Sequence, residues 1–369
     1  MEQHTLDLAK GMIDRGHELF VWCADGKLAQ LFSDLGADVT RKTPSLDIDP
    51  VYIFALSRFL KSKKIEIMHS HELKASVNAL IAGALSGTPA RITHTHTPIS
   101  EWQIEGLKKK VDTAVYRFLV NKFSSREIAL TDSRKYIKQL EGIKEEKLEV
   151  IPNGLDTARF SVGELQRRDY RHEILERLDL PSNAFIFGNI SRLTKEKGHD
   201  VLLDAFAQFL KSSEDRKLDI SNVFLVIAGG GELEGSLKAK VSELGITERV
   251  FFTGRFEDAD LIKLYSTFDA FLFPSLAEGF GLVLVEAMAS GISVICSDLD
   301  VLKEVGGPTV MYFETGNALA LSEKMYDLYM RFDRFAELRE SAVQRVAELF
   351  TMERFLDGYE NLYKELLNI

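Results

Sequence analysis

Short apolar runs alternate with segments of helical periodicity along the first half of the chain. The runs have the length of strands and lie at 18–23, 65–69, 91–95, 128–131 and 148–151. The helical segments between them lie at 6–15, 27–35, 50–60, 73–85, 101–122 and 134–140. This rhythm is typical of a doubly wound parallel sheet with helices on both faces.

A second alternating set follows the segment Ile151-Pro152-Asn153-Gly154 and a polar stretch that ends near Pro181. Its predicted strands lie at 185–190, 223–228, 250–252, 270–273, 294–296 and 310–312. We therefore expect an α/β protein with two Rossmann-like domains, at 1–151 and 152–350, and a C-terminal helix at 351–369 that crosses back to the first domain. Ligands of such sheets bind beyond the carboxyl ends of the strands, so the predicted site is a cleft between the domains.

Composition narrows the class of protein. The chain has 369 residues, of which 45% are hydrophobic and 28% charged, and a net charge of -10. The acidic balance argues against nucleic-acid binding. Cys23 and Cys296 each end a predicted strand, so we interpret them as buried free thiols of a cytoplasmic protein. No apolar run has the length of a membrane-spanning helix.

The stretch FLFPSLAEGFGLVLVEAMASG, at 271–291, carries the clearest candidate chemistry. It predicts a buried strand, a Gly-rich loop and a helix that begins near Leu282. Loop N–H groups and the positive end of the helix would face a polar ligand above the loop. Glu278 lies in the loop and Glu286 one turn into the helix, where it can accept hydrogen bonds from hydroxyl groups. The alternative is a Gly-rich turn with two solvated acids.

Two cations follow the first strand of the second domain. Arg192 and Lys197 lie between the end of that strand and a helix that begins near Gly198. Arginine offers a planar fork of donors and lysine a point charge, and together they suit a diphosphate. A solvated basic turn is the alternative. The later Glu278 loop on the same sheet edge favours the diphosphate site.

These motifs together resemble the retaining glycosyltransferases of family 4 (group 1), which have the GT-B fold. The resemblance covers nearly the whole chain, from LAKGMIDRGHELFVW through VIPNGLDTARF to ISRLTKEKGHDVLLDAF, FLVIAGGGELEGSL, VFFTGRFED and the stretch at 271–291. It implies a hexosyltransferase that moves a sugar from a nucleotide-diphosphate sugar to a glycan or lipid-linked acceptor, with retention, without a metal and without a cofactor. Cell-envelope polysaccharide biosynthesis is the setting that it implies.

The resemblance also implies roles for individual residues. It gives catalytic roles to His96 and Glu278, and donor binding to Arg192, Lys197, Phe256, Gly279, Phe280, Gly281, Leu282 and Glu286. The two cations would hold the diphosphate, Glu286 the ribose hydroxyls, and the loop backbone the sugar and diphosphate. Phe256 would lie near the base and His96 near the transferred sugar.

The first domain also carries two histidine pairs, His69 with His71 and His94 with His96, at the ends of predicted strands. Alternate strand residues share a face, so each pair can converge on one ligand. Taken alone, this pattern predicts a metal site, and a metallohydrolase is the second function class. A third is a family member that binds the nucleotide-sugar without turnover.

A basic run in the first domain suggests contact with a membrane. The run is Lys108-Lys109-Lys110, and the apolar residues near it are Trp102, Leu107, Val111 and Tyr116. This pattern is consistent with a peripheral contact at the inner face of the membrane, which suits a lipid-linked acceptor. A solvated helix face is the alternative.

The chain opens with a helix, MEQHTLDLAKGM, whereas a doubly wound domain normally opens with a central strand. In the family that it resembles, a strand and a Gly-rich loop precede this helix. We therefore expect the first domain to lack its first strand, with a gap between neighbouring parallel strands and a chain of low activity or stability.

Overall fold

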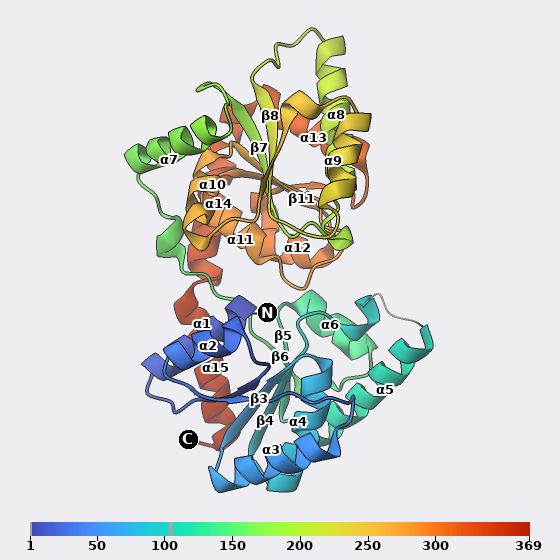
Figure 1. Ribbon diagram of the computed structural model, residues 1–369, viewed down its shortest axis with the longest axis vertical. Helices are drawn as coiled ribbons and strands as arrows, with labels where there is room; N and C mark the ends of the chain where they lie inside the picture. Colours follow the sequence, from blue (N-terminus) through green and yellow to red (C-terminus); the bar gives the residue numbers. More distant parts are fainter. Residues whose placement is uncertain (1, 103–105) are drawn as a thin grey trace. The chain divides into compact units, whose positions relative to one another are not determined.

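The computed structural model describes residues 2–102 and 106–369, apart from the side chain of Glu2, and divides into two compact units (Figure 1). Unit 1 comprises Met1–Gly154 and Met352–Ile369, and unit 2 comprises Leu155–Thr351. Both contain parallel strands covered by helices, so the α/β class predicted from the sequence is confirmed. Among the described helices, none combines the length and the apolar character that crossing a bilayer requires.

Unit 1 contains two parallel sheets, with strand orders β1-β2 and β3-β4-β5-β6. The strands are β1 (Phe20–Cys23), β2 (Asp38–Arg41), β3 (Ile67–His71), β4 (Ala90–His94), β5 (Arg126–Ala129) and β6 (Leu148–Val150). Within the described residues no ladder joins β1 to β3.

Helices cover both faces of the larger sheet in unit 1. Buried side chains of α3, α4 and α5 pack on one face, and those of α1 and α15 pack on the other. The helices of unit 1 are α1 (Glu2–Asp14), α2 (Lys27–Asp34), α3 (Pro50–Ser62), α4 (Leu73–Ser86), η1 (Ile99–Glu101), α5 (Gly106–Phe123), α6 (Asp132–Leu140), η2 (Glu145–Lys147) and α15 (Met352–Leu367).

Unit 2 is built on one parallel sheet with the strand order β12-β11-β10-β7-β8-β9. Its strands are β7 (Phe185–Ile190), β8 (Val223–Ala228), β9 (Val250–Gly254), β10 (Ala270–Phe273), β11 (Ser293–Ser297) and β12 (Met311–Phe313). All residues of β8, β10 and β11 are buried, as expected for a parallel sheet covered on both faces. The order places β7 beside β10, although the paired residues Phe187 and Ala270 are 83 positions apart along the chain.

Figure 1 shows α8, α9 and α13 on one side of this sheet and α7, α10 and α14 on the other. Side chains of the first three helices form an apolar core with the strands. The helices are η3 (Thr157–Phe160), α7 (Glu164–Arg177), η4 (Lys195–Lys197), α8 (His199–Asp215), α9 (Glu234–Glu243), η5 (Thr247–Arg249), α10 (Asp258–Thr267), α11 (Leu282–Ala289), α12 (Asp300–Gly306), η6 (Gly307–Thr309), α13 (Ala318–Met330), η7 (Phe332–Phe335) and α14 (Ala336–Leu349).

Two expectations for unit 1 need correction. The sequence analysis missed β2, because Asp38-Val39-Thr40-Arg41 is a short edge strand with two exposed charged residues. It also ended β3 at His69, whereas the strand continues to His71, because pairing with β4 extends the ladder through the polar residues. Part of the helix expected at 101–122 falls on 103–105, outside the described residues.

Gly198 illustrates how closely the loops of unit 2 approach one another. Its φ is +68°, and a Cβ at this position would overlap the carbonyl oxygen of Pro274, which follows β10. Only glycine adopts this backbone conformation without strain and also leaves room for that carbonyl group. The loops after β7 and β10 therefore meet at a contact that excludes any side chain.

We predict that Gly198→Ala lowers the free energy of unfolding more than Gly245→Ala does. Both glycines have φ +68°, but the space around a Cβ at Gly245 is open. Both variants incur the strain of a left-handed alanine, about 1–2 kcal/mol, and only the first also collides with backbone. Thermal and denaturant unfolding of the two variants measures the difference, and equal losses would contradict the close approach.

Candidate functional site

The loops after β7 and β10 lie side by side at the carboxyl edge of the unit 2 sheet. The backbone N–H of Leu276 donates to the carbonyl oxygen of Glu196 at 2.8 Å, which joins them directly. Parallel neighbouring strands end at the same edge, so the adjacency of β7 and β10 brings both loops together. The cations and carboxylates that the sequence analysis singled out are thus held on one edge.

Lys197 and Glu278 form an ion pair between these two loops. Their side chains are only 15% and 11% exposed, and the Ser275 hydroxyl also donates to Glu278, at 3.1 Å. The sequence analysis expected the two residues to contact different parts of a ligand and did not foresee the pair. An anion bound at this place would have to displace Glu278 as the partner of Lys197, whose ammonium group the ion pair already positions.

Arg192 lies on the same loop but is held loosely. Its side chain is 75% exposed and pairs with Glu196 at 3.2 Å, and the Thr194 hydroxyl also donates to Glu196 at 2.7 Å. An exposed pair of this kind contributes little to stability. The guanidinium group is therefore free to turn toward an incoming phosphate at small cost.

The Gly-rich loop offers its backbone rather than its side chains. Phe280 is buried, and its ring packs edge-on against Phe350 with centroids 5.6 Å apart. Gly281 has φ +89° and directly precedes α11, whose first residue is Leu282. Besides the Glu278 carboxylate, the N–H groups of the loop and of the first residues of α11 are the polar groups by which this segment can bind a ligand.

Glu286 lies on α11 and is half-buried. Burial raises the pKa of its carboxyl group to about 7, and the hydrogen bond from Tyr265 Oη, 2.8 Å from Oε2, opposes this rise only partly. Tyr265 comes from α10 and was not among the residues predicted from the sequence, because its partner is 21 positions away. A tyrosine on a predicted helix carries no sequence signal for such a contact.

Phe256 lies apart from these loops in the strand order. It follows β9, the edge strand, which β8 and β7 separate from β10. The residue is half-buried. The structure therefore places Phe256 at the same carboxyl edge as Lys197, but at the far side of it.

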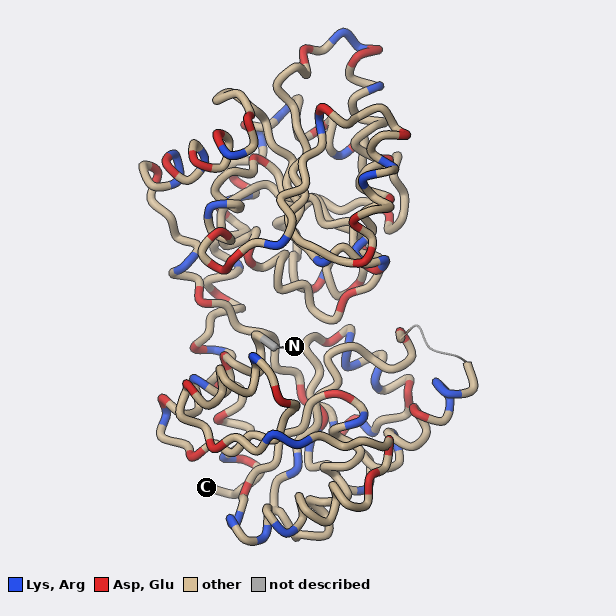
Figure 2. The backbone as a smooth tube through the Cα atoms, in the orientation of Figure 1, with Lys and Arg blue, Asp and Glu red and all other residues tan. Residues whose placement is uncertain are grey.

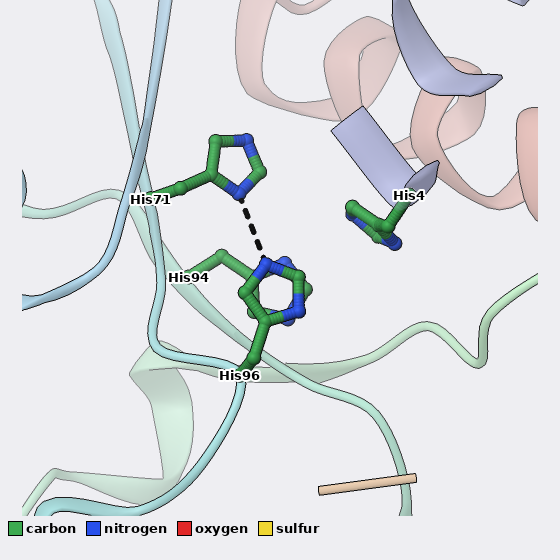
Figure 3. A group of neighbouring side chains, drawn as sticks. All are labelled: His4, His71, His94 and His96. Carbon is green, nitrogen blue, oxygen red and sulfur yellow. Dashed lines mark hydrogen bonds between the residues drawn. The ribbon is translucent and has the colours of Figure 1, made fainter. Parts of the chain in front are cut away.

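Unit 1 brings four histidines together at the carboxyl ends of β3 and β4. Figure 3 shows His71 and His96 joined by a hydrogen bond, with His94 beside His96, and His4 reaching the group from α1. The bond joins Nδ1 of His71 and Nε2 of His96 at 3.4 Å. One ring nitrogen from each of the four lies within 4.8 Å of the others.

Three of the four histidines in the predicted pairs therefore come together, namely His71, His94 and His96, and His4 joins them in place of His69. His69 is outside this group and lies near Tyr363, whose hydroxyl is 3.5 Å from Nδ1 of His69. His4 takes its place, and sequence reasoning missed it because it precedes the nearest predicted partner by more than 60 residues. The sequence shows His4 only as a histidine on the first predicted helix, which does not by itself indicate a metal ligand.

These imidazoles are neutral at pH 7. Burial is the main cause and lowers the pKa of His4 to about 4 and that of His96 to about 2. Burial and the neighbouring imidazoles also hold the pKa values of His71 and His94 well below the ordinary range. Each ring therefore keeps one nitrogen without a proton, which can accept a hydrogen bond or bind a metal.

A buried polar network fixes the segment between His94 and His96. Thr95 donates through its hydroxyl to Glu127 at 2.9 Å and receives bonds from Lys138 to its carbonyl and hydroxyl oxygens, each at 2.8 Å. Lys138 also pairs with Glu127, and Tyr116 donates to the same carboxylate at 2.7 Å. Burial alone would raise the pKa of Glu127, but Lys138 and the hydroxyl donors hold it below its usual value. This network sets the position of His96.

Two family models match the chain. The model described as "Glycosyltransferase Family 4" matches residues 1–159, and the model "Glycosyl transferases group 1" matches residues 171–345. Together they span most of both units.

Individual relatives agree with these models. The chain is 31% identical over 262 residues to an Escherichia coli UDP-Gal:alpha-D-GlcNAc-diphosphoundecaprenol alpha-1,3-galactosyltransferase, a match that covers 69% of this chain and 64% of that protein. It is 28% identical to a Mycobacterium leprae phosphatidyl-myo-inositol mannosyltransferase, over 98% of this chain and 93% of that one. The first of these matches thus spans less than two thirds of the relative's length.

A solved structure supports the fold. The structure of Anabaena HepE in complex with UDP superimposes with a TM-score of 0.83, over 99% of this chain and 96% of that one, at 22% identity. The GT-B fold expected from the sequence is therefore confirmed, and nothing in these comparisons supports a metallohydrolase. The chain belongs to the family 4, or group 1, glycosyltransferases.

Proposed function

We propose that this protein is a retaining, metal-independent hexosyltransferase that moves a sugar from a nucleotide-diphosphate sugar to a glycan or lipid-linked acceptor in cell-envelope polysaccharide biosynthesis. The observation that carries the proposal is the Lys197–Glu278 pair, held beside the N–H groups at the start of α11. A cation and helix N–H groups in one sheltered place suit the charge of a diphosphate. The E. coli relative, named as an enzyme that uses UDP-Gal, and the Anabaena structure in complex with UDP support this class of donor.

The leaving diphosphate dictates what the site has to supply. As the bond between the sugar and the diphosphate breaks, negative charge grows on the phosphate oxygens. Lys197 stabilises this charge from a fixed position, and Arg192 does so after its side chain turns toward the phosphate. Glu286 accepts hydrogen bonds from the ribose hydroxyls. Glu278, displaced from Lys197, accepts from hydroxyls of the donor sugar.

Retention follows if the acceptor attacks on the face that the diphosphate leaves. The departing phosphate oxygen takes the proton of the acceptor hydroxyl, and the new glycosidic bond forms on the same face. We propose this route rather than a covalent glycosyl-enzyme, because Glu278, once displaced from Lys197, is assigned to the hydroxyls of the donor sugar and also accepts a hydrogen bond from Ser275. His96 is the residue of unit 1 that we assign to the transferred sugar.

A family member that binds the nucleotide-sugar without turnover is the competing function. The two differ in one measurement, because a binder shows donor affinity and neither transfer nor donor hydrolysis. Incubation with labelled nucleotide-sugars and lipid or glycan acceptors, followed by chromatography of the products, separates them.

Removal of one cation tests the diphosphate site. We expect Arg192→Ala to weaken UDP binding by about 10- to 100-fold, since a charge-assisted hydrogen bond contributes about 1.5–3 kcal/mol. Binding of uridine, which has no phosphate, should not change. Lys195→Ala is the matched control, because this exposed lysine lies in the same loop. Calorimetry that finds UDP affinity unchanged in Arg192→Ala, or equally reduced in both variants, would contradict the assignment.

The raised pKa of Glu286 gives a pH test of the ribose contact. Ribose hydroxyls donate to the ionised carboxylate, which forms as the pH rises through about 7. The affinity advantage of wild type over Glu286→Gln should therefore be small at pH 6 and reach about tenfold or more at pH 8. Because protonation of the nucleotide affects both proteins equally, it cancels in the ratio of the two affinities. Calorimetry that finds a ratio independent of pH would exclude an ionised Glu286 as the acceptor.

We further propose that α5 makes a peripheral contact with the inner face of the membrane. Its residues Leu107, Val111 and Phe118 are 78%, 52% and 57% exposed and share one face of the helix. Figure 2 marks the lysines of α5 in blue, and helical spacing places Lys108 and Lys110 on either side of this apolar stripe. An apolar stripe flanked by cations suits an anionic bilayer surface.

The opposite face of α5 packs against the protein core. Tyr116, Leu119 and Val120 are buried there, and the Tyr116 hydroxyl donates to Glu127. The sequence analysis had counted Tyr116 among the residues near the bilayer, and this was wrong, because the residue lies on the other side of the helix. The membrane surface that we propose therefore consists of Leu107, Val111, Phe118 and the lysines beside them.

The double variant Leu107→Ser/Phe118→Ser should bind vesicles that contain phosphatidylglycerol at least tenfold more weakly than wild type. Each burial of such a side chain contributes about 1.5–3 kcal/mol. Leu165→Ser on α7 is the control, since Leu165 is 77% exposed in unit 2. Co-sedimentation with vesicles measures the binding, and high salt should weaken that of wild type. Absence of wild-type binding, or equal binding by the double variant, would refute the contact.

A further inference from the structure

We propose that His4, His71, His94 and His96 form a binding site for one divalent transition metal such as Zn²⁺, and that the bound metal inhibits the enzyme. One nitrogen from each ring lies within 4.8 Å of the other three (Figure 3). Tetrahedral zinc with bonds of about 2.0–2.1 Å to nitrogen places its ligands about 3.3 Å apart. The pair His71 Nδ1 and His96 Nε2, at 3.4 Å, already has this spacing.

Regular elements hold three of the four ligands. His71 ends β3, His94 ends β4, and the two are register partners on these paired strands. His4 lies on the first turn of α1. Ligands on such elements are held more firmly than ligands on loops, so little ordering is required when a metal binds. The most distant nitrogens need to approach by about 1.5 Å, which small side-chain rotations supply.

Two unusual features of the cluster point to a ligand. Nε2 of His94 is fully buried and has no hydrogen-bond partner within the described part of the chain. A buried polar atom without a partner is costly, and a metal at the centre of the cluster would satisfy it. Nδ1 of His4 lies 2.6 Å from Oδ1 of Asn153. That carbonyl oxygen accepts the proton of Nδ1, which is the outer support that metal-binding histidines usually have, so Nε2 is the nitrogen without a proton. Nε2 lies 3.4 Å from the Tyr359 hydroxyl, so a metal has to replace that contact.

The choice of metal follows from the ligands. Four neutral imidazoles suit Zn²⁺, Co²⁺, Ni²⁺ or Cu²⁺, whereas Mg²⁺, Mn²⁺ and Ca²⁺ prefer oxygen ligands.

Metal binding replaces the hydrogen bond between His71 and His96. The proton of that bond moves to the other nitrogen of the ring that carries it. No proton is released by these two residues.

The number of ligands indicates inhibition rather than catalysis. Four histidines complete a tetrahedral shell and leave no position for a water molecule, unlike the open site of a hydrolytic zinc enzyme. The metal also takes the free nitrogen of His96, the residue assigned to the transferred sugar. This second half of the proposal rests on the proposed function, whereas the metal site itself does not.

Titration of the full chain with Co²⁺ tests the site without an activity assay. Wild type should bind one equivalent with the visible absorption of tetrahedral cobalt, and Zn²⁺ should displace it. His71→Gln and His4→Gln should each bind at least tenfold more weakly. Asn153→Ala keeps all four ligands and should lose about 10- to 100-fold, as for other residues that orient a ligand. His172→Gln, at an exposed histidine of α7, should bind as wild type does.

Absence of tetrahedral absorption in wild type would overturn the proposal, and so would equal affinity in wild type, His71→Gln and His4→Gln. Circular dichroism checks that each variant is folded. If a histidine variant does not fold, the cobalt affinity of Asn153→Ala, which keeps all four histidines, still tests the site. One equivalent of Zn²⁺ should inhibit sugar transfer by wild type and not by His71→Gln, with no inhibition by Mg²⁺. Binding without inhibition would refute the inhibitory half alone. A chain that binds cobalt but never transfers sugar would refute the proposed function and leave the metal site intact.

Discussion

The adjacency of β7 and β10 is the constraint on which the rest of the proposed donor site depends. These strands pair in parallel, so their following loops emerge at the same edge, and Gly198 allows one loop to approach the backbone of the other. Lys197 and Glu278 can then form an ion pair between the loops in a largely buried place. Such a pair gains little net stability, because desolvation offsets most of the attraction. Its value is that a cation is kept ready for an anionic ligand.

A different buried charge pair organises unit 1. Glu127 and Lys138 are almost completely inaccessible to solvent and are joined to Thr95 and Tyr116 by hydrogen bonds. Loss of one partner would leave an unpaired buried charge, so the group acts as a unit. Because Thr95 lies between His94 and His96, the network fixes both imidazoles at the end of β4.

The sequence predicted the strands of unit 2 closely, since runs such as Val223–Ala228 are apolar throughout and have strand length. It missed β2, where Asp38 and Arg41 are exposed, because a short polar edge strand has no apolar pattern. The residues of the donor loops came from motifs and family resemblance. Their partners, such as Tyr265 for Glu286, depend on helix packing that no local pattern encodes. His4 was missed for the same reason.

A crystal structure of the protein with UDP tests the central claim most directly, because it locates the diphosphate against named atoms. The account predicts that Lys197 Nζ leaves Glu278 and lies within hydrogen-bond distance of a phosphate oxygen. It also predicts that the ribose hydroxyls contact Glu286 and that N–H groups at the start of α11 face the diphosphate. A nucleotide bound elsewhere in the molecule, with the Lys197–Glu278 pair intact, would contradict it.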